Sequence, residues 1–81
     1  MRDIEYKKAL LGYINGGYTI IEVLGGFCLA YNENAPSKFA TWIWDIYPNQ
    51  YGENVFSFYY GHYWNDSKLA LQDLVERATA L

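Results

Sequence analysis

An 81-residue chain with a 52% hydrophobic content has room for one domain with one core, and this composition excludes a disordered tail. Its aromatic content of 20% is high, so some rings must lie on the surface. The formal net charge is −3 and the six Lys and Arg residues are scattered, which disfavours binding to nucleic-acid phosphates.

The first predicted element is a helix over residues 3–15. Asp3 can cap its N-terminus, and Ile4, Leu10, Leu11 and Ile14 fall on one broad side. The sequence Asn15-Gly16-Gly17 then predicts a helix stop, because glycine accepts the left-handed conformation that follows a helix C-terminus.

Four strands are predicted next, because runs of β-branched and aromatic residues alternate with turn signals. They cover residues 18–24, 27–31, 39–46 and 54–64. Gly25-Gly26 predicts a tight hairpin turn between the first two strands. Residues 32–38 are predicted to be a polar loop, and Pro36 prevents a strand from continuing across it. Residues 47–53 form a longer hairpin loop, with Tyr51 near its tip.

The fourth strand is apolar or aromatic on both sides. At period two, one side carries Phe56, Phe58, Tyr60, His62 and Trp64, and the other carries Val55, Ser57, Tyr59, Gly61 and Tyr63. Antiparallel sheets usually alternate apolar and polar residues, so this departure predicts a sheet with a second apolar face to cover.

The last element is a helix that begins after Asn65, Asp66 or Ser67 and ends at about Thr79. Leu71, Leu74, Val75 and Ala78 follow helical spacing, which predicts a buried row, with Asp73 and Arg77 paired on the exposed side. The order predicts a single α+β domain over residues 1–81: helix, four-stranded antiparallel β-meander, helix. We expect a two-layer sandwich with both helices on one sheet face.

Residues that carry chemistry are few. Cys28 and His62 could form a nucleophile and its base, but Cys28 lies mid-strand among apolar neighbours, which predicts an inert thiol. One cysteine excludes a disulfide framework, and His62 lacks companions at metal-ligand spacing. Glu22 and Asp45 are interpreted as solvated strand carboxylates. We therefore expect no enzymatic activity, cofactor or metal.

The N-terminal residues lack the apolar core of a signal peptide, and no run approaches membrane-spanning length. A cytoplasmic location without membrane contact is expected. The helix–meander–helix order is similar to that of double-stranded RNA binding domains, but the basic helix start that such domains use is absent, since the final helix begins Asn-Asp-Ser-Lys.

Two segments carry a resemblance to a group of proteins. Tyr60-Gly61-His62-Tyr63-Trp64-Asn65-Asp66, following Gly26-Phe27-Cys28-Leu29-Ala30-Tyr31-Asn32, resembles small uncharacterised proteins of bacterial phages and mobile elements. This resemblance implies an accessory protein, with an inhibitor of host defence machinery as one role, and brings no active site with it.

The leading hypothesis is a non-enzymatic binding or regulatory protein that presents aromatic side chains to a protein partner. The candidate interface residues are Trp42, Trp44, Tyr51, Tyr59, His62 and Tyr63. Two alternatives stay open: a homodimeric scaffold whose aromatic faces pack together, and a small-ligand or enzyme site around His62.

Overall fold

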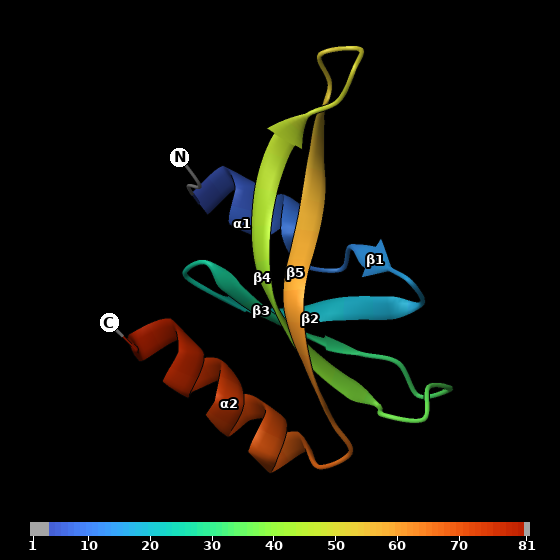
Figure 1. The fold of residues 1–81 in the computed structure, drawn as a ribbon, viewed down its shortest axis with the longest axis vertical. Helices are drawn as coiled ribbons and strands as arrows, with labels where there is room; N and C mark the ends of the chain where they lie inside the picture. Colours follow the sequence, from blue (N-terminus) through green and yellow to red (C-terminus); the bar gives the residue numbers. More distant parts are fainter. Residues whose placement is uncertain (1–3, 81) are drawn as a thin grey trace.

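The computed structural model describes residues 4–80, which form a five-stranded antiparallel sheet and two helices (Figure 1). The elements in chain order are α1 (Ile4–Leu10), β1 (Ile14–Asn15), β2 (Tyr18–Leu24), β3 (Phe27–Tyr31), β4 (Phe39–Pro48), β5 (Asn54–Trp64) and α2 (Ser67–Thr79). Each strand pairs with the next along the chain. The α+β class and the meander between two helices are confirmed. No helix within residues 4–80 is long and apolar enough to cross a membrane.

The beginning of the chain differs from the prediction of one helix over 3–15. Helix α1 ends at Leu10, because Gly12 has a φ of +86°, a left-handed conformation that no helix can continue. Residues 14–15 then form β1, a fifth strand that the sequence did not predict. The glycines at 16–17 make the turn from β1 into β2 and do not stop a helix. The predicted cap at Asp3 lies outside the described residues.

The two helices lie on opposite faces of the sheet, so the predicted sandwich with both helices on one face is wrong. Leu10 of α1 packs in a cluster with Cys28, whereas Leu74 of α2 packs against Leu29. Successive residues of a strand point to opposite faces, so neighbours in β3 belong to different layers. Both faces of β3 are apolar, and each needs its own cover. The sheet is therefore the middle layer.

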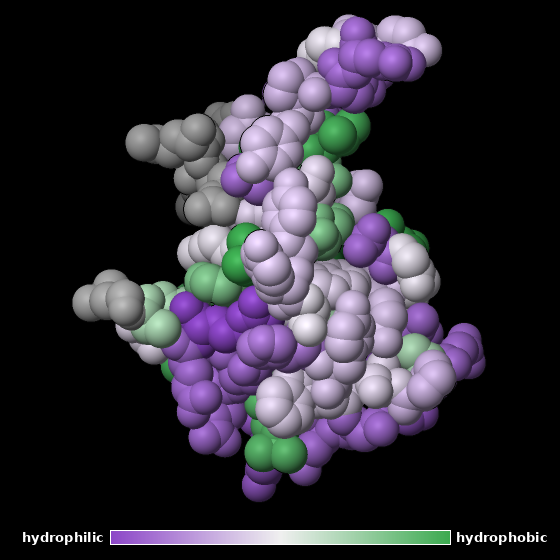
Figure 2. Space-filling view, in the orientation of Figure 1, coloured by the Kyte–Doolittle hydropathy of each residue, from purple (hydrophilic) through white to green (hydrophobic). Residues whose placement is uncertain are grey.

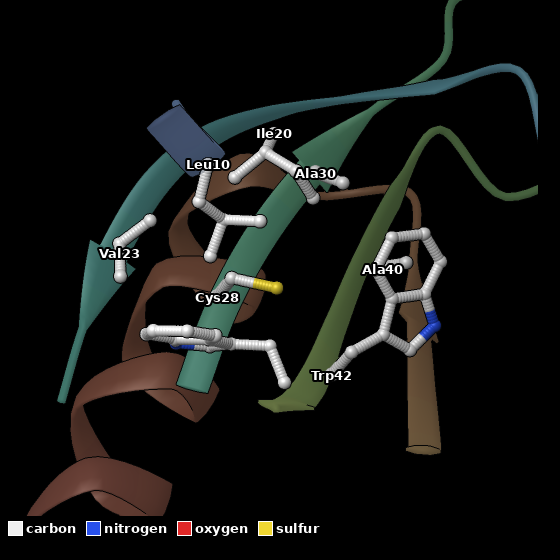
Figure 3. Close-up of a cluster of buried hydrophobic side chains, with 8 residues drawn as sticks. Leu10, Ile20, Val23, Cys28, Ala30, Ala40 and Trp42 are labelled. Atoms are coloured by element: carbon white, nitrogen blue, oxygen red, sulfur yellow. The ribbon is translucent and has the colours of Figure 1, made fainter. Parts of the chain in front are cut away.

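The larger core lies on the α1 side of the sheet. Its buried members are Leu10, Ile20, Val23, Cys28, Ala30, Ala40, Trp42 and Trp44. Figure 3 shows these side chains converging from α1 and from strands β2 to β4, with α2 beyond the strands. The sheet also curls over this core. The curl brings the Tyr13 ring, just before β1, to a centroid distance of 5.1 Å from the ring of Phe56 in β5.

Helix α2 is capped by Asp66, whose side chain accepts hydrogen bonds from the Lys68 and Leu69 amides. Its end at Thr79 confirms the predicted extent. The face turned to the sheet carries Ala70, Asp73, Leu74 and Arg77, at the spacing of one helical stripe. The predicted burial of Leu74 is confirmed, but Leu71 and Val75 are exposed. The predicted exposed side is wrong, because Asp73 and Arg77 face the sheet.

Candidate functional site

A β-bulge divides β5 into two parts. Trp42 of β4 faces two residues of β5, Tyr60 and Gly61. The cross-strand pairs on either side of the bulge are Thr41–His62 and Ile43–Tyr59. Tyr60 has a φ of +53° and is the one residue other than glycine with a positive φ in the described part of the chain. This backbone conformation costs about 1 kcal/mol or more for a residue with a Cβ.

The bulge reverses the alternation of side chains along β5. Phe56 and Phe58, before it, pack on the α1-side core, whereas Trp64, after it, packs on the cluster under α2. His62 pairs with Thr41 and also lies on the α2 side. The predicted single row from Phe56 to Trp64 is therefore wrong, because an extra residue at the bulge changes the face that every later residue occupies.

Beneath α2, a polar network joins the helix to β4 and β5. The His62 Nδ1 atom lies 2.9 Å from Oδ2 of Asp73 and 3.1 Å from Oδ1. The Thr41 hydroxyl donates to Asp73 Oδ2 at 2.5 Å. Thr41 is fully buried, and the Asp73 side chain is 12% exposed against 50% for His62. The Asp73 carboxylate is thus held from two strands at once.

Arg77 completes this network and holds the bulge. Its Nη1 donates to the Thr41 carbonyl at 3.1 Å and to the Thr41 hydroxyl at 3.0 Å, and its Nη2 donates to the Tyr60 carbonyl at 2.8 Å. The guanidinium also lies 5.3 Å from the centre of the Phe27 ring, within cation–π range. One side chain of α2 therefore fixes the strained backbone of β5.

The pKa of Asp73 follows from these contacts. Burial raises the pKa of this carboxyl, but the hydrogen bond from Thr41, then the hydrogen bond and charge of His62, outweigh burial and hold the pKa below its ordinary 3.8. Trp64 adds a smaller lowering through a buried indole N–H, which forms no well-aligned hydrogen bond of its own within the described residues.

A depressed pKa predicts how stability depends on pH. Because the folded state holds the Asp73 proton more weakly than the unfolded state, this carboxylate stabilises the fold above the ordinary pKa of 3.8. The contribution is lost as pH falls through the lower folded value. We expect the stability difference between the wild type and Asp73→Asn to be present at pH about 5, where the carboxylate is ionised, and to shrink on acidification below that. Urea unfolding at a series of pH values measures it, and a pH-independent difference would contradict it.

Neither Thr41 nor Cys28 is placed to act as a nucleophile beside His62. A His–Asp pair acts in catalysis when it activates a nucleophile within reach of the imidazole. The Thr41 hydroxyl is buried and already bonded to both Asp73 and Arg77, so no substrate can reach it. Cys28 lies on the opposite face of the sheet from His62, so the two cannot act as nucleophile and base. The contacts of this cluster support a structural role.

The Cys28 thiol is expected to be inert in the folded protein. Burial raises its pKa to about 12, against smaller lowering by a hydrogen bond from the Trp42 backbone and by the Arg77 charge. Since the thiolate is the reactive form, we expect a disulfide reagent such as DTNB to label the native protein at least about 100-fold more slowly than the urea-unfolded chain. Equal rates in both states would contradict the buried position.

The outer part of the β4–β5 hairpin, here called the arm (residues 43–59), extends past the end of α2 (Figure 1). Arg77, near the end of this helix, reaches no further than the bulge. The arm face is defined as the side of the arm that continues the α2 side of the sheet. Its members, in cross-strand pairs, are Ile43–Tyr59, Asp45–Ser57 and Tyr47–Val55. The side chains of the other side pack into the α1-side core, and the hydrogen bonds of α2 to the hairpin end at Thr41 and Tyr60, so within residues 4–80 no helix covers the arm face.

Tyrosine and acidic side chains dominate the arm face. Tyr47 is 48% and Tyr59 38% exposed, and Val55 is also exposed. The Tyr47 hydroxyl donates to Asp45 Oδ2 at 3.2 Å, and this hydrogen bond, followed by one with Tyr59, raises the pKa of Tyr47. Residues 39–66 hold three acidic residues and no Lys or Arg. In Figure 2 strongly hydrophilic residues gather at the tip of the arm and over α2. The arm is therefore acidic and aromatic.

The six predicted interface residues separate into two groups. Trp42 and Trp44 are core residues, 6% and 1% exposed, so neither presents a ring to a partner. Both side chains lie on the α1 side of the sheet, in the core that the curled sheet covers. The other four remain at the surface: Tyr51 at the tip of the arm, Tyr59 on the arm face, His62 beside α2, and Tyr63 on the α1 side, where its hydroxyl accepts from Trp42 Nε1 at 3.3 Å. They do not form one surface.

Two exposed tyrosines of the β4–β5 hairpin were missing from the predicted set. Tyr47 shares a face with Asp45, two residues earlier in the same strand, and this period-two spacing could have placed it. Tyr60 is exposed because the bulge turns it outwards, and Gly61, a glycine inside a strand pattern, is the local signal that could have indicated the bulge.

No group of three or more His, Cys, Asp and Glu residues among those described could hold a metal ion. The chain matches no protein-family model, and comparisons with curated proteins and with solved structures find no significant similarity.

Proposed function

We propose that this chain is a small non-enzymatic binding protein that docks a protein partner on the arm face. The observation that carries the proposal is the pair of exposed tyrosines, Tyr47 and Tyr59, on an extended hairpin without a helix over it. Tyrosine supplies a large contact area with few rotatable bonds, so it is frequent among interface residues that dominate affinity. The hairpin pairing and the contact with Asp45 hold both rings in place before binding.

The charge of the arm supports a basic partner surface. Asp45 and Glu53 are its charged residues, and a cation can contact both a carboxylate and a tyrosine ring. The sequence resemblance to small phage and mobile-element proteins suggests a setting for such binding. In that setting the chain acts on host machinery, with inhibition of a defence protein as the outcome.

The test is photo-crosslinking with matched positions. A photoreactive phenylalanine analogue at position 59 is expected to capture a partner from a lysate of the source organism, and the same analogue at the exposed position 71 on α2 serves as the control. With the captured partner purified, Tyr47→Ala and Tyr59→Ala should each weaken its binding by about 2 kcal/mol, or about 30-fold. Unchanged affinity in the folded double variant would refute the arm face as the binding surface.

A further inference from the structure

The outer edge of β5 is an unusually open strand edge. β5 is the last strand of the sheet and pairs with β4 alone. Apart from the ladder with β4, no backbone hydrogen bond within residues 4–80 reaches residues 54–59. At the opposite side of the sheet, the unpaired stretch of β2 is shorter. The two residues of β1 pair with the start of β2, and a register shift in β2 follows at Ile21. Exposed strand edges invite pairing with another chain unless charges, proline or bulges protect them.

The register shows which backbone groups of β5 point outwards. At the tip, the Asn49 amide donates to the Glu53 carbonyl at 2.7 Å. Antiparallel ladders alternate between bonded and non-bonded pairs, so Val55, Ser57 and Tyr59 bond to β4. The backbone groups of Asn54, Phe56 and Phe58 therefore point away from the sheet. The Trp44 amide donates to the Gly26 carbonyl, on the side of β4 away from β5. Trp44 and its partner Phe58 are therefore a non-bonded pair, which agrees with this assignment.

The open part of this edge is bounded. Residues 54–59 contain no Lys, Arg or Pro, the residues that commonly protect an edge. At Tyr60 the bulge interrupts the ladder, and Arg77 occupies the Tyr60 carbonyl. The remaining six residues span about 20 Å, which is the length of an ordinary strand.

A strand added here would place its side chains in two different environments. One alternate set would lie on the arm face, beside Ser57 and Tyr59. Ser57 is short and pairs with Asp45, so a long cation opposite Ser57 could reach across it to the Asp45 carboxylate and contact the Tyr59 ring. The added strand would lie two strand spacings, about 9.6 Å, from β4, and an extended arginine side chain together with the Asp45 side chain can cover this distance. The other set would lie beside Phe56 and Phe58, where apolar side chains fit.

We propose that the partner contributes an extended segment of alternating basic and apolar residues, which binds as a sixth strand along residues 54–59 of β5. This inference rests on the proposed function and adds the binding mode and the chemistry of the partner. The backbone hydrogen bonds provide affinity, and the alternate side-chain environments provide selectivity. The arm's acidic charge favours a basic segment over a second copy of this chain, which carries the same net negative charge.

The test uses a defined peptide, acetyl-(Arg-Val)4-amide, with the full chain labelled for NMR. At peptide concentrations of about ten times Kd, hydrogen exchange at the Phe56 and Phe58 amides should slow about tenfold, because those amides become hydrogen-bonded. A peptide of the same composition with four Arg followed by four Val, and an alternating Glu-Val peptide, should give no protection.

N-methylated peptides separate strand addition from side-chain contact. In antiparallel pairing the valine amides face Phe56 and Phe58, so methylation of the valine nitrogens should abolish binding, whereas methylation of the arginine nitrogens should preserve it. On the protein side, Asn54→Pro should block the peptide without removing a bond to β4, and Asn54→Ala should not.

Three results would overturn the inference. A peptide that shifts arm-face resonances without protecting the Phe56 and Phe58 amides would exclude strand addition and leave arm-face docking standing. Equal effects of the two methylated peptides would do the same. Protection of both amides that rises with protein concentration in the absence of peptide would assign the edge to a second copy of the chain. Loss of arm-face docking itself is measured separately, by the Tyr47→Ala and Tyr59→Ala variants with the crosslinked partner.

Discussion

Replacing Trp44 by alanine is expected to lower the free energy of unfolding by about 3–5 kcal/mol. Trp44 is 1% exposed within the α1-side core, and its indole N–H donates to the Gly25 carbonyl at 2.9 Å. The substitution removes the largest buried side chain and leaves that carbonyl without its donor. A domain of this length has a total stability of about 4–12 kcal/mol, so the substitution removes a large share of it and, at the low end of that range, unfolds much of the protein at room temperature.

Urea unfolding followed by circular dichroism measures this loss. Trp44→Phe keeps an aromatic ring but loses the hydrogen bond, so an intermediate loss is expected. Tyr51→Ala is the matched control, since Tyr51 is an exposed ring at the tip of the arm and its removal should change stability by less than about 0.5 kcal/mol. If Trp44→Ala cost as little as Tyr51→Ala, the buried position of Trp44 would be wrong and its predicted role as a surface anchor would regain support.

Replacing Arg77 by alanine should lower the free energy of unfolding by about 2–3 kcal/mol, because a charged donor of several hydrogen bonds is lost. Its partners are Thr41, on β4, and the Tyr60 carbonyl at the bulge. The loss of Arg77 leaves the Thr41 carbonyl with one donor fewer in a buried setting, and it frees the backbone that holds Tyr60 at positive φ. We therefore expect faster amide exchange at residues 60–62 as well as lower stability.

Two variants make the Arg77 result specific. Arg77→Lys keeps the charge but cannot donate from two planar nitrogens to two strands, so it should recover only part of the loss. Lys68→Ala, on the exposed side of the same helix, should stay within about 0.5 kcal/mol of the wild type. A stability of Arg77→Ala equal to that of Lys68→Ala would show that the network does not support the fold.

The elements could be predicted from sequence because their signals are local. Gly25 and Gly26 predicted the first hairpin, Pro36 bounded a loop, and Asp66 capped the last helix. All of these depend on neighbours within a few residues. The short strand β1 was missed for the opposite reason: Ile14 belongs to a helical pattern locally, and its strand conformation follows from the positive φ of Gly12 and from pairing with β2.

The placement of side chains could not be predicted, because both faces of the sheet are apolar. The phase of α2 illustrates this: Leu71 and Val75 are more hydrophobic than Asp73 and Arg77, yet the charged pair faces the sheet. The buried Thr41 hydroxyl makes that choice favourable, and it lies more than thirty residues away in the chain. The bulge at Tyr60 had a sequence signal in Gly61, a glycine inside a strand, but that glycine does not fix which residue is extra. The bulge places Tyr59 and Tyr63 on opposite sides of the sheet.

The bulge also limits how the length of this chain can vary. Deleting one residue between Phe58 and His62 would restore simple alternation and turn His62 and Trp64 away from α2 towards the opposite side. The hairpin loop at 49–53 has no such constraint, because its hydrogen bonds join Asn49 to residues within the loop itself. Insertions and deletions among natural or engineered variants should therefore be tolerated in this loop and selected against within β5.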